Sequence, residues 1–158
     1  MERTVKIAQA RFCIEDIIFK YAEAVDGGTL ESLGLLFSRA ELKNADGQVV
    51  VGDDIVQHYA DRVIMYDAKG NEASYQPGVT TPRTRHVTTN LIYEFNNAVD
   101  RADVRSCFTA YQTIDRANEI VAGGRYVDVF EKDLQGWHIV SREILLDNWG
   151  DTSRLMRR

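Results

Sequence analysis

Apolar residues between positions 6 and 26 recur at the three-four spacing of one helical face. The positions that define this face are Ile7, Ala10, Ile14, Ile17, Ile18, Tyr21, Ala22 and Val25. Phe12, Cys13 and Phe19 widen the apolar arc, which predicts a helix covered on most of its sides. Two glycines at 27–28 end this helix, and Thr29 can cap a shorter helix that ends at residue 37. The pattern therefore predicts a helical hairpin at the start of the chain.

The segment that follows mixes strand and helix patterns. The pair Asp46-Gly47 lies between two short segments of residues 41–51, which is typical of a β-hairpin. Asp53 then caps a predicted amphipathic helix that runs through Ile64. Residues 67–82 contain Gly, Pro, Ser and Asn without a period, which indicates a long loop.

β-branched and aromatic residues dominate the second half of the chain and predict four long strands. These strands cover residues 84–95, 103–115, 125–132 and 137–145. The breaks between them are short, so neighbours should pair antiparallel as a meander, and the GGR at 123–125 is interpreted as a hairpin turn. Helices first and strands later predict an α+β fold, in which a curved antiparallel sheet wraps around the long helix.

Length and charge narrow the class of protein. A chain of 158 residues suits a single domain and buries roughly 70% of its unfolded surface, which leaves room for a pocket. The 19 Lys and Arg residues against 24 Asp and Glu residues give a net charge of −5, which argues against nucleic acid and anionic membranes as partners. Arg154, Arg157 and Arg158 are expected to form a solvated basic tail.

Targeting signals and cysteines add further expectations. No apolar stretch approaches the ~20 residues of a membrane helix, and the start of the chain lacks the apolar segment of a signal peptide. We therefore expect a cytoplasmic protein without a membrane partner. Cys13 and Cys107 are far apart and outside any CxxC spacing, which predicts two buried free thiols rather than a disulfide or a thiolate metal site.

Sequence motifs exclude several kinds of chemistry. The chain contains no GxGxxG, GxxxxGK, GxSxG or HExxH pattern, which removes the usual support for dinucleotide binding, Walker-type phosphate binding, elbow-type hydrolysis and zinc-protease chemistry. The three histidines, His58, His86 and His138, lie on different predicted elements, so we expect no metal and no cofactor. His138 is expected to be exposed, and His58 is expected on a helix surface.

Asp26 and His86 are the candidates for acid-base chemistry. Asp26 closes the first helix, where the macrodipole disfavours a carboxylate by about 0.3–1 kcal/mol, so it is either a solvated turn residue or a carboxylate that orients a histidine. His86 shares one polar strand face with Thr84, Thr88 and Asn90. On the concave side of the sheet this imidazole could act as a general base, and on the convex side it would be solvated. Periodicity alone does not choose the side.

Four runs of the chain resemble one known family. They are YAEAVDGGTLESLGLLF, GDDIVQHYADRV, TRHVTTNLIYEF and GGRYVDVFEKDLQGWHIVSREI. In this order and spacing, over about residues 8–146, they resemble the SnoaL-like branch of the nuclear transport factor 2-like superfamily, with residues 147–158 as a tail. The resemblance implies a cone, formed by a strongly curved antiparallel sheet on a long helix, with a deep pocket at one end. It also implies a homodimer or homotrimer.

The resemblance further implies a catalytic dyad. Scytalone dehydratase, bile-acid 7-alpha-dehydratase and hexachlorocyclohexane dehydrochlorinase use an Asp and a His, without metal, for proton abstraction and elimination. Asp26 and His86 stand at the matching positions, and Tyr21 matches a tyrosine that binds the substrate oxygen. Asp26 would then orient His86, His86 would take the proton, and Tyr21 would donate its hydroxyl. Tyr111 stands near the place of the second catalytic histidine of scytalone dehydratase, which is a departure from that enzyme.

Further residues are expected to contact the substrate. Arg142 and Tyr111 could bind a carboxylate or carbonyl, although Arg142 could equally be a structural ion-pair partner. The other predicted substrate-binding residues are Ile17, Tyr59, Val63, Asn90, Phe108, Tyr126 and Trp149. An error of one residue in strand parity would turn a strand member outward.

Three functional hypotheses follow. The first is a cofactor-independent lyase or isomerase of the dehydratase type, which abstracts a proton next to a carbonyl of a small, mostly apolar cyclic substrate. The second is a domain that binds a hydrophobic ligand, aromatic or alicyclic, or a partner chain without turnover. The third is the small subunit of a ring-hydroxylating dioxygenase, which shares the cone fold.

Overall fold

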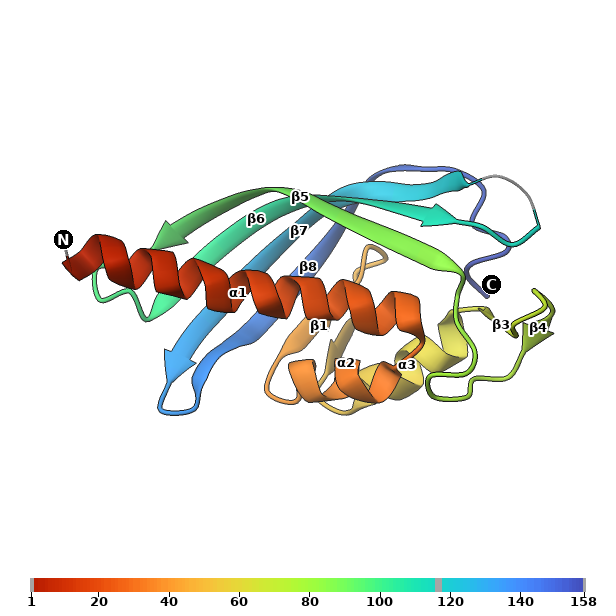
Figure 1. Cartoon of the computed structure of the whole chain (residues 1–158), viewed down its shortest axis with the longest axis horizontal. Helices are drawn as coiled ribbons and strands as arrows, with labels where there is room; N and C mark the ends of the chain where they lie inside the picture. Colours follow the sequence, from red (N-terminus) through yellow and green to blue (C-terminus); the bar gives the residue numbers. More distant parts are fainter. Residues whose placement is uncertain (1, 116–117, 158) are drawn as a thin grey trace.

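A long helix lies along the inner face of a curved sheet (Figure 1). The computed structural model describes residues 2–115 and 118–157. Helix α1 spans Glu2–Gly27 and buries one stripe of side chains against the sheet. Ile14 and Ile18 in this stripe are almost fully buried, and each contributes about 1.5–3 kcal/mol by its removal from water.

The prediction that the first helix is covered on most of its sides was wrong, since the outer side of α1 is exposed. Phe12 is 75% exposed and Phe19 is 50% exposed, because the sheet covers only one face of the helix. Cys13 is exposed on α1, and Cys107 is only half-buried. The expectation of two buried thiols was therefore wrong, and both cysteines are free.

The main sheet has six strands in the order β2-β1-β8-β7-β6-β5. The bounds are β1 Glu41–Lys43, β2 Val49–Val51, β5 Thr84–Phe95, β6 Arg101–Gln112, β7 Glu119–Asp133 and β8 Gly136–Trp149. Strands β5 to β8 form the predicted antiparallel meander, and β1 and β2 form the predicted hairpin. Strand β1 also pairs with β8 in parallel, so the sheet is mixed. The predicted α+β fold, with a curved sheet wrapped on a long helix, is confirmed.

Two glycines expected in a turn lie inside a strand. Gly123 and Gly124 belong to β7, and the register of β7 against β8 shifts between them. A Cβ on Gly124 would lie 2.0 Å from the Leu145 carbonyl oxygen, so a side chain cannot fit there. The glycines therefore allow a close approach of β8 rather than a chain reversal.

Strand β5 changes its inward face partway along. Its register against β6 shifts between Thr89 and Ile92, and Asn90 has a φ of 55°, in the left-handed region. Before the bulge Thr84 and His86 face inward, and after it Tyr93 does. A bulge adds one residue to one strand, so the predicted alternation fails beyond it.

The remaining elements lie around and beyond the C-terminal end of α1 (Figure 1). They are α2 Leu30–Phe37, α3 Asp54–Arg62, β3 Met65–Tyr66 and β4 Glu72–Ala73. Neither Thr29 nor Asp53 makes the predicted side-chain cap. The Tyr75 hydroxyl instead accepts from the Leu30 amide at 3.1 Å, which satisfies one free donor of α2.

The backbone of the C-terminal segment packs against the molecule, which was not expected of a tail, while the side chains of Arg154 and Arg157 are exposed as expected. Met156 bridges to Val63 just after α3, where the predicted helix should have continued. The Arg154 carbonyl accepts from the Tyr66 hydroxyl at 2.6 Å, and the Arg157 amide donates to the Arg62 carbonyl at 2.8 Å. The last arginine of the predicted tail, at position 158, lies outside the described residues. Among the described helices, none has the length and hydropathy to cross a membrane.

Candidate functional site

A cavity of about 280 Å³ opens between the inner face of the sheet, the end of α1 and helix α3. The C-terminal segment and the β1–β2 turn complete its walls. The lining residues are Tyr21, Val25, Asn44, Ala45, Asp46, His58, Tyr59, Arg62, Val63, Pro82, Thr84, His86, Phe108, Ala122, Tyr126, Ile144, Leu146, Thr152, Leu155 and Met156. Most of these side chains are apolar or aromatic, which is usual for a small-molecule site.

His86 lines this cavity, and Asp26 lies in direct contact with His86, outside the lining. His86 Nδ1 is 2.6 Å from Asp26 Oδ1, and the His86 backbone N–H donates to Asp26 Oδ2 at 2.7 Å. The Thr84 hydroxyl donates to Oδ1 at 2.7 Å. The helix end and the strand thus hold one carboxylate through three hydrogen bonds. The tertiary structure places His86 on the concave side, the alternative that periodicity left open.

These contacts keep Asp26 ionised. Burial by itself raises the pKa of the Asp26 carboxyl, but the hydrogen bonds from His86 and Thr84 outweigh it and lower the pKa below its ordinary value of 3.8. A carboxylate accepts hydrogen bonds, so a neutral His86 carries its proton on Nδ1. Its Nε2 atom then presents a lone pair, which is the form required of a general base.

The depressed pKa of Asp26 predicts a pH-dependent contribution to stability. Because the folded-state pKa lies below the unfolded value of 3.8, this contribution is fully present above the unfolded value and is lost as the pH falls through the folded one. We expect the free energy of unfolding of the wild type, relative to Asp26→Asn, to decline in that acidic range. Urea denaturation of both proteins between about pH 6 and pH 2 measures this difference. A difference that stays constant with pH contradicts the prediction.

Two buried tyrosines form the second polar feature of the cavity. The hydroxyls of Tyr21 and Tyr59 are 2.7 Å apart. Burial raises the pKa of the Tyr21 phenol, and burial raises that of Tyr59 well above its ordinary value of 10.0, so both are protonated at neutral pH. One O–H serves the bond between them, which leaves the other O–H to donate to a ligand oxygen.

A buried ion pair supports these rings from behind. Arg142 Nε and Nη2 donate to the Asp128 carboxylate at 2.8 and 2.6 Å, and both side chains are almost fully buried. The Arg142 guanidinium lies 4.2 Å from the ring centres of Tyr21 and Tyr126. Arg142 is therefore a structural ion-pair partner, as one of the two alternatives held, and it does not line the cavity.

Four other predicted substrate-binding residues also lie outside the cavity lining. Asn90 is exposed at the β5 bulge, and Trp149 is 68% exposed at the end of β8. Tyr111 alternates with the buried Ala110 and Gln112, so it takes the other face of β6. Ile17 packs against the core beside the inward stripe of α1. The expected Tyr21, Tyr59, Val63, Phe108 and Tyr126 do line the cavity.

Sequence reasoning missed several lining residues. His58 was expected on a helix surface, and it borders the cavity from α3. His138, which lies outside the lining, was also expected to be exposed, and its side chain is only 21% exposed. Leu155 and Met156 belong to the segment interpreted as a tail. The sequence did contain a signal that this segment is packed, because Leu155 and Met156 are two adjacent apolar residues between arginines.

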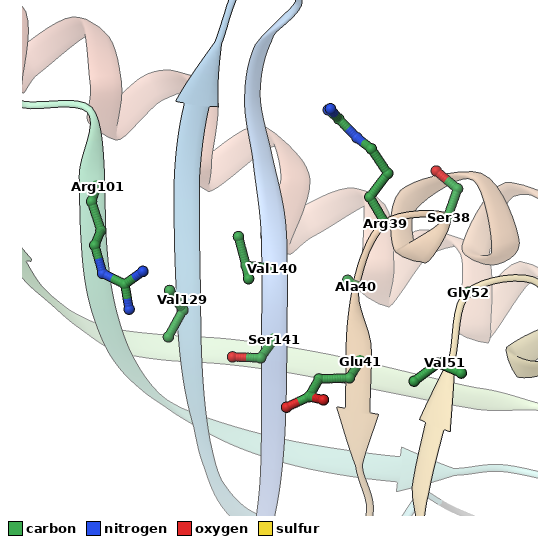
Figure 2. Close-up of a pocket in the computed structure, with 10 residues that line it drawn as sticks. All are labelled: Ser38, Arg39, Ala40, Glu41, Val51, Gly52, Arg101, Val129, Val140 and Ser141. Atoms are coloured by element: carbon green, nitrogen blue, oxygen red, sulfur yellow. The ribbon is translucent and has the colours of Figure 1, made fainter.

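A second groove lies on the sheet face away from α1 (Figure 2). Its Arg101 pairs with Glu131 at 2.5 Å, and its Arg39 pairs with Asp133 at 2.6 Å. None of the ten described residues that line this groove is a histidine, cysteine or tyrosine. Nor do residues 2–115 and 118–157 bring together three His, Cys, Asp or Glu side chains that could hold a metal ion. The concave cavity is therefore the candidate site.

Comparison with known proteins agrees with this architecture. The family model described as the SnoaL-like domain matches residues 7–143. A search of curated proteins found no significant match. A scytalone dehydratase-like protein of Novosphingobium aromaticivorans is 22% identical, with a TM-score of 0.66 over 94% of this chain and 91% of that one. The hexachlorocyclohexane dehydrochlorinase of Novosphingobium barchaimii is 15% identical, with a TM-score of 0.68 over 93% and 92%.

A third solved structure carries the name of the fold. It is a nuclear transport factor 2-like protein of Novosphingobium aromaticivorans with a cystatin-like fold, 15% identical, with a TM-score of 0.69 over 97% of this chain and 92% of that one. At such identities the structural likeness establishes the fold alone. The family model covers most of the sequence. The chain therefore belongs to the SnoaL-like domain family and has the cystatin-like fold of the nuclear transport factor 2-like proteins.

Proposed function

We propose that the chain is a cofactor-independent lyase or isomerase, which abstracts a proton next to a carbonyl of a small, mostly apolar cyclic substrate. The observation that carries the proposal is the contact of 2.6 Å between the buried Asp26 and His86, which lines a largely apolar cavity of about 280 Å³. The names dehydratase and dehydrochlorinase of two structural relatives support the same class of reaction.

The reaction begins with transfer of a proton from carbon to nitrogen. The lone pair of His86 Nε2 takes the α-proton, the C–H electrons form the double bond of an enolate, and the carbonyl electrons move onto oxygen. The Asp26 carboxylate stabilises the resulting imidazolium. The free O–H of the Tyr21–Tyr59 pair donates to the enolate oxygen, and this stabilisation is larger in a water-poor cavity than in water.

Two outcomes are open to the enolate. In an elimination its electrons expel a substituent from the next carbon, and the His86 imidazolium returns its proton to a leaving hydroxyl. In an isomerisation the same proton returns to another carbon. Both outcomes leave His86 neutral and ready for the next cycle, and both share the first step.

That first step is measured as hydrogen-deuterium exchange in heavy water, followed by mass spectrometry. The probe is β-decalone, a bicyclic ketone with acidic α-protons. We expect the wild type to accelerate exchange and His86→Ala to reduce the acceleration by about 10²–10⁴-fold, the usual worth of a general base. His138→Ala is the matched control, since His138 lies outside the cavity lining.

Either of two results contradicts the proposal. If His86→Ala exchanges the α-protons of β-decalone at the wild-type rate, His86 is not the base. Tight binding of β-decalone by the wild type without any exchange supports instead the hypothesis of a domain that binds an apolar ligand without turnover.

A further inference from the structure

A second histidine borders the candidate site and takes no part in the proposed proton transfer. His58 lines the cavity from helix α3, whereas His86 lines it from strand β5. The His58 ring packs edge-on against Tyr59, with 5.9 Å between the ring centres. The cavity thus has two imidazoles on two different walls.

Asn44 determines which nitrogen of His58 carries the proton. Asn44 Nδ2 is 3.0 Å from His58 Nε2 and 3.4 Å from the Gln48 carbonyl oxygen. A carbonyl accepts only from a donor, so we assign the atom of Asn44 at this position as the amide nitrogen. The same nitrogen donates to His58 Nε2, which must therefore be the acceptor. The proton of the neutral ring is consequently on Nδ1.

Burial, more than the surrounding charges, favours the neutral form of the His58 ring. Burial lowers the pKa of His58 below 6.5, and the charge of Arg62 lowers it further. Asp46 on the β1–β2 turn and Asp61 on α3 oppose this shift but do not reverse it. A protonated ring would also turn Nε2 into a donor that faces the Asn44 amide group.

The neighbouring cation is already engaged. Arg62 Nη2 donates to Asp46 at 2.5 Å, and Arg62 Nη1 donates to Gln48 Oε1 at 2.6 Å. This wall of the cavity therefore combines a paired guanidinium with a neutral imidazole. Among the described residues, only Asn44 hydrogen-bonds to the His58 ring, so the Nδ1–H group is available to a ligand.

We propose that His58 is a specificity-determining residue, whose Nδ1–H donates to an uncharged oxygen at the end of the ligand remote from His86. This inference rests on the proposed function and narrows it. The substrate class becomes a cyclic compound with two oxygen functions, a carbonyl beside the acidic C–H and a second acceptor on the opposite side of the ring system. A compound with a single oxygen leaves the His58 donor unpaired against apolar surface, which lowers its affinity.

The first test reads the tautomer of His58 directly and needs no ligand. Nuclear magnetic resonance of nitrogen-labelled imidazoles distinguishes a ring protonated at Nδ1 from one protonated at Nε2. We expect His58 to be neutral and protonated at Nδ1 at pH 7. In Asn44→Asp the carboxylate accepts where the amide donated, so the proton should move to Nε2 or the ring should become a cation. A wild-type His58 that is cationic, or protonated at Nε2, overturns the proposal.

The second test compares two probes of nearly equal size. β-Decalone has one carbonyl, and the matched decalindione has a second carbonyl on the other ring in place of a methylene. We expect the wild type to bind the dione about fivefold to tenfold more tightly, the value of one hydrogen bond to an uncharged group. His58→Phe keeps an aromatic ring without the donor and should abolish this preference. His58→Gln restores a neutral donor and should recover part of it.

The outcomes separate this inference from the proposed function. A dione preference that survives in His58→Phe contradicts the role of His58, whatever the exchange rate. Failure of the wild type to bind either probe contradicts the proposed ligand class. Loss of the preference in His58→Phe, together with an absence of α-proton exchange by the wild type, supports the binding role while contradicting catalysis.

Discussion

Asp26→Asn is expected to slow α-proton exchange by about 10³–10⁴-fold, although the new side chain has almost the same shape. The reason lies in the partners of the two carboxylate oxygens. The His86 backbone N–H donates to Oδ2, so the amide oxygen of the asparagine must take this position. The amide nitrogen then faces His86 Nδ1 in place of Oδ1. A donor at that point drives the imidazole proton to Nε2, and the base loses its lone pair.

Two measurements check this expectation. The exchange rate with β-decalone gives the size of the loss, and nuclear magnetic resonance of the His86 nitrogens gives the tautomer. Asp16→Asn is the matched control, because Asp16 is a carboxylate of the same helix with a side chain 60% exposed. An exchange rate within tenfold of the wild type, or an unchanged His86 tautomer in Asp26→Asn, contradicts the assigned role of Asp26.

Breaking the Arg142–Asp128 pair is expected to produce the largest loss of stability. The side chains are 1% and 0% exposed, and Arg142→Met leaves the Asp128 carboxylate buried without its partner. Loss of one member of such a pair lowers the free energy of unfolding by about 3–5 kcal/mol. In the double variant Arg142→Met with Asp128→Leu no charge is stranded, so most of the stability should return.

The same pair of strands supplies a control with the same geometry. Arg125 Nε and Nη2 donate to Asp147 at 2.8 and 2.7 Å, but these side chains are 55% and 41% exposed. Water solvates each partner when the other is removed, so Arg125→Met should change the urea midpoint little. Equal losses for Arg142→Met and Arg125→Met would contradict the dependence on burial. A double variant no more stable than Arg142→Met would contradict it as well.

The alternation of side chains along the strands predicted part of the candidate site correctly and part of it wrongly. The alternation along β5 correctly placed Thr84 and His86 on one face, because no irregularity separates them. The same alternation wrongly included Asn90, which lies at a bulge with a φ of 55°. Gly123 and Gly124 were similarly misassigned, because glycine favours both tight turns and close strand approach. The predicted homodimer or homotrimer stays a prediction.

Local sequence patterns were sufficient to predict the long helix, the β-hairpin of residues 41–51, the four-strand meander and the family. These features depend on the period of apolar residues along each element and on the order of the runs that resemble the family, and both are written locally in the chain. The pairing of Asp26 with His86 was predicted from that resemblance, and the interatomic distances support it.

Three features became visible only in the folded chain: His86 faces the concave side of the sheet, Arg142 stands behind the tyrosines, and His58 borders the cavity. The periodicity of an element defines its apolar face relative to its own axis, but not the element that will cover the opposite face. The C-terminal segment shows the same limit, since Leu155 and Met156 become cavity walls only where residues distant in sequence meet them. Sheet curvature and bulges bring those distant residues together, and local patterns do not record them.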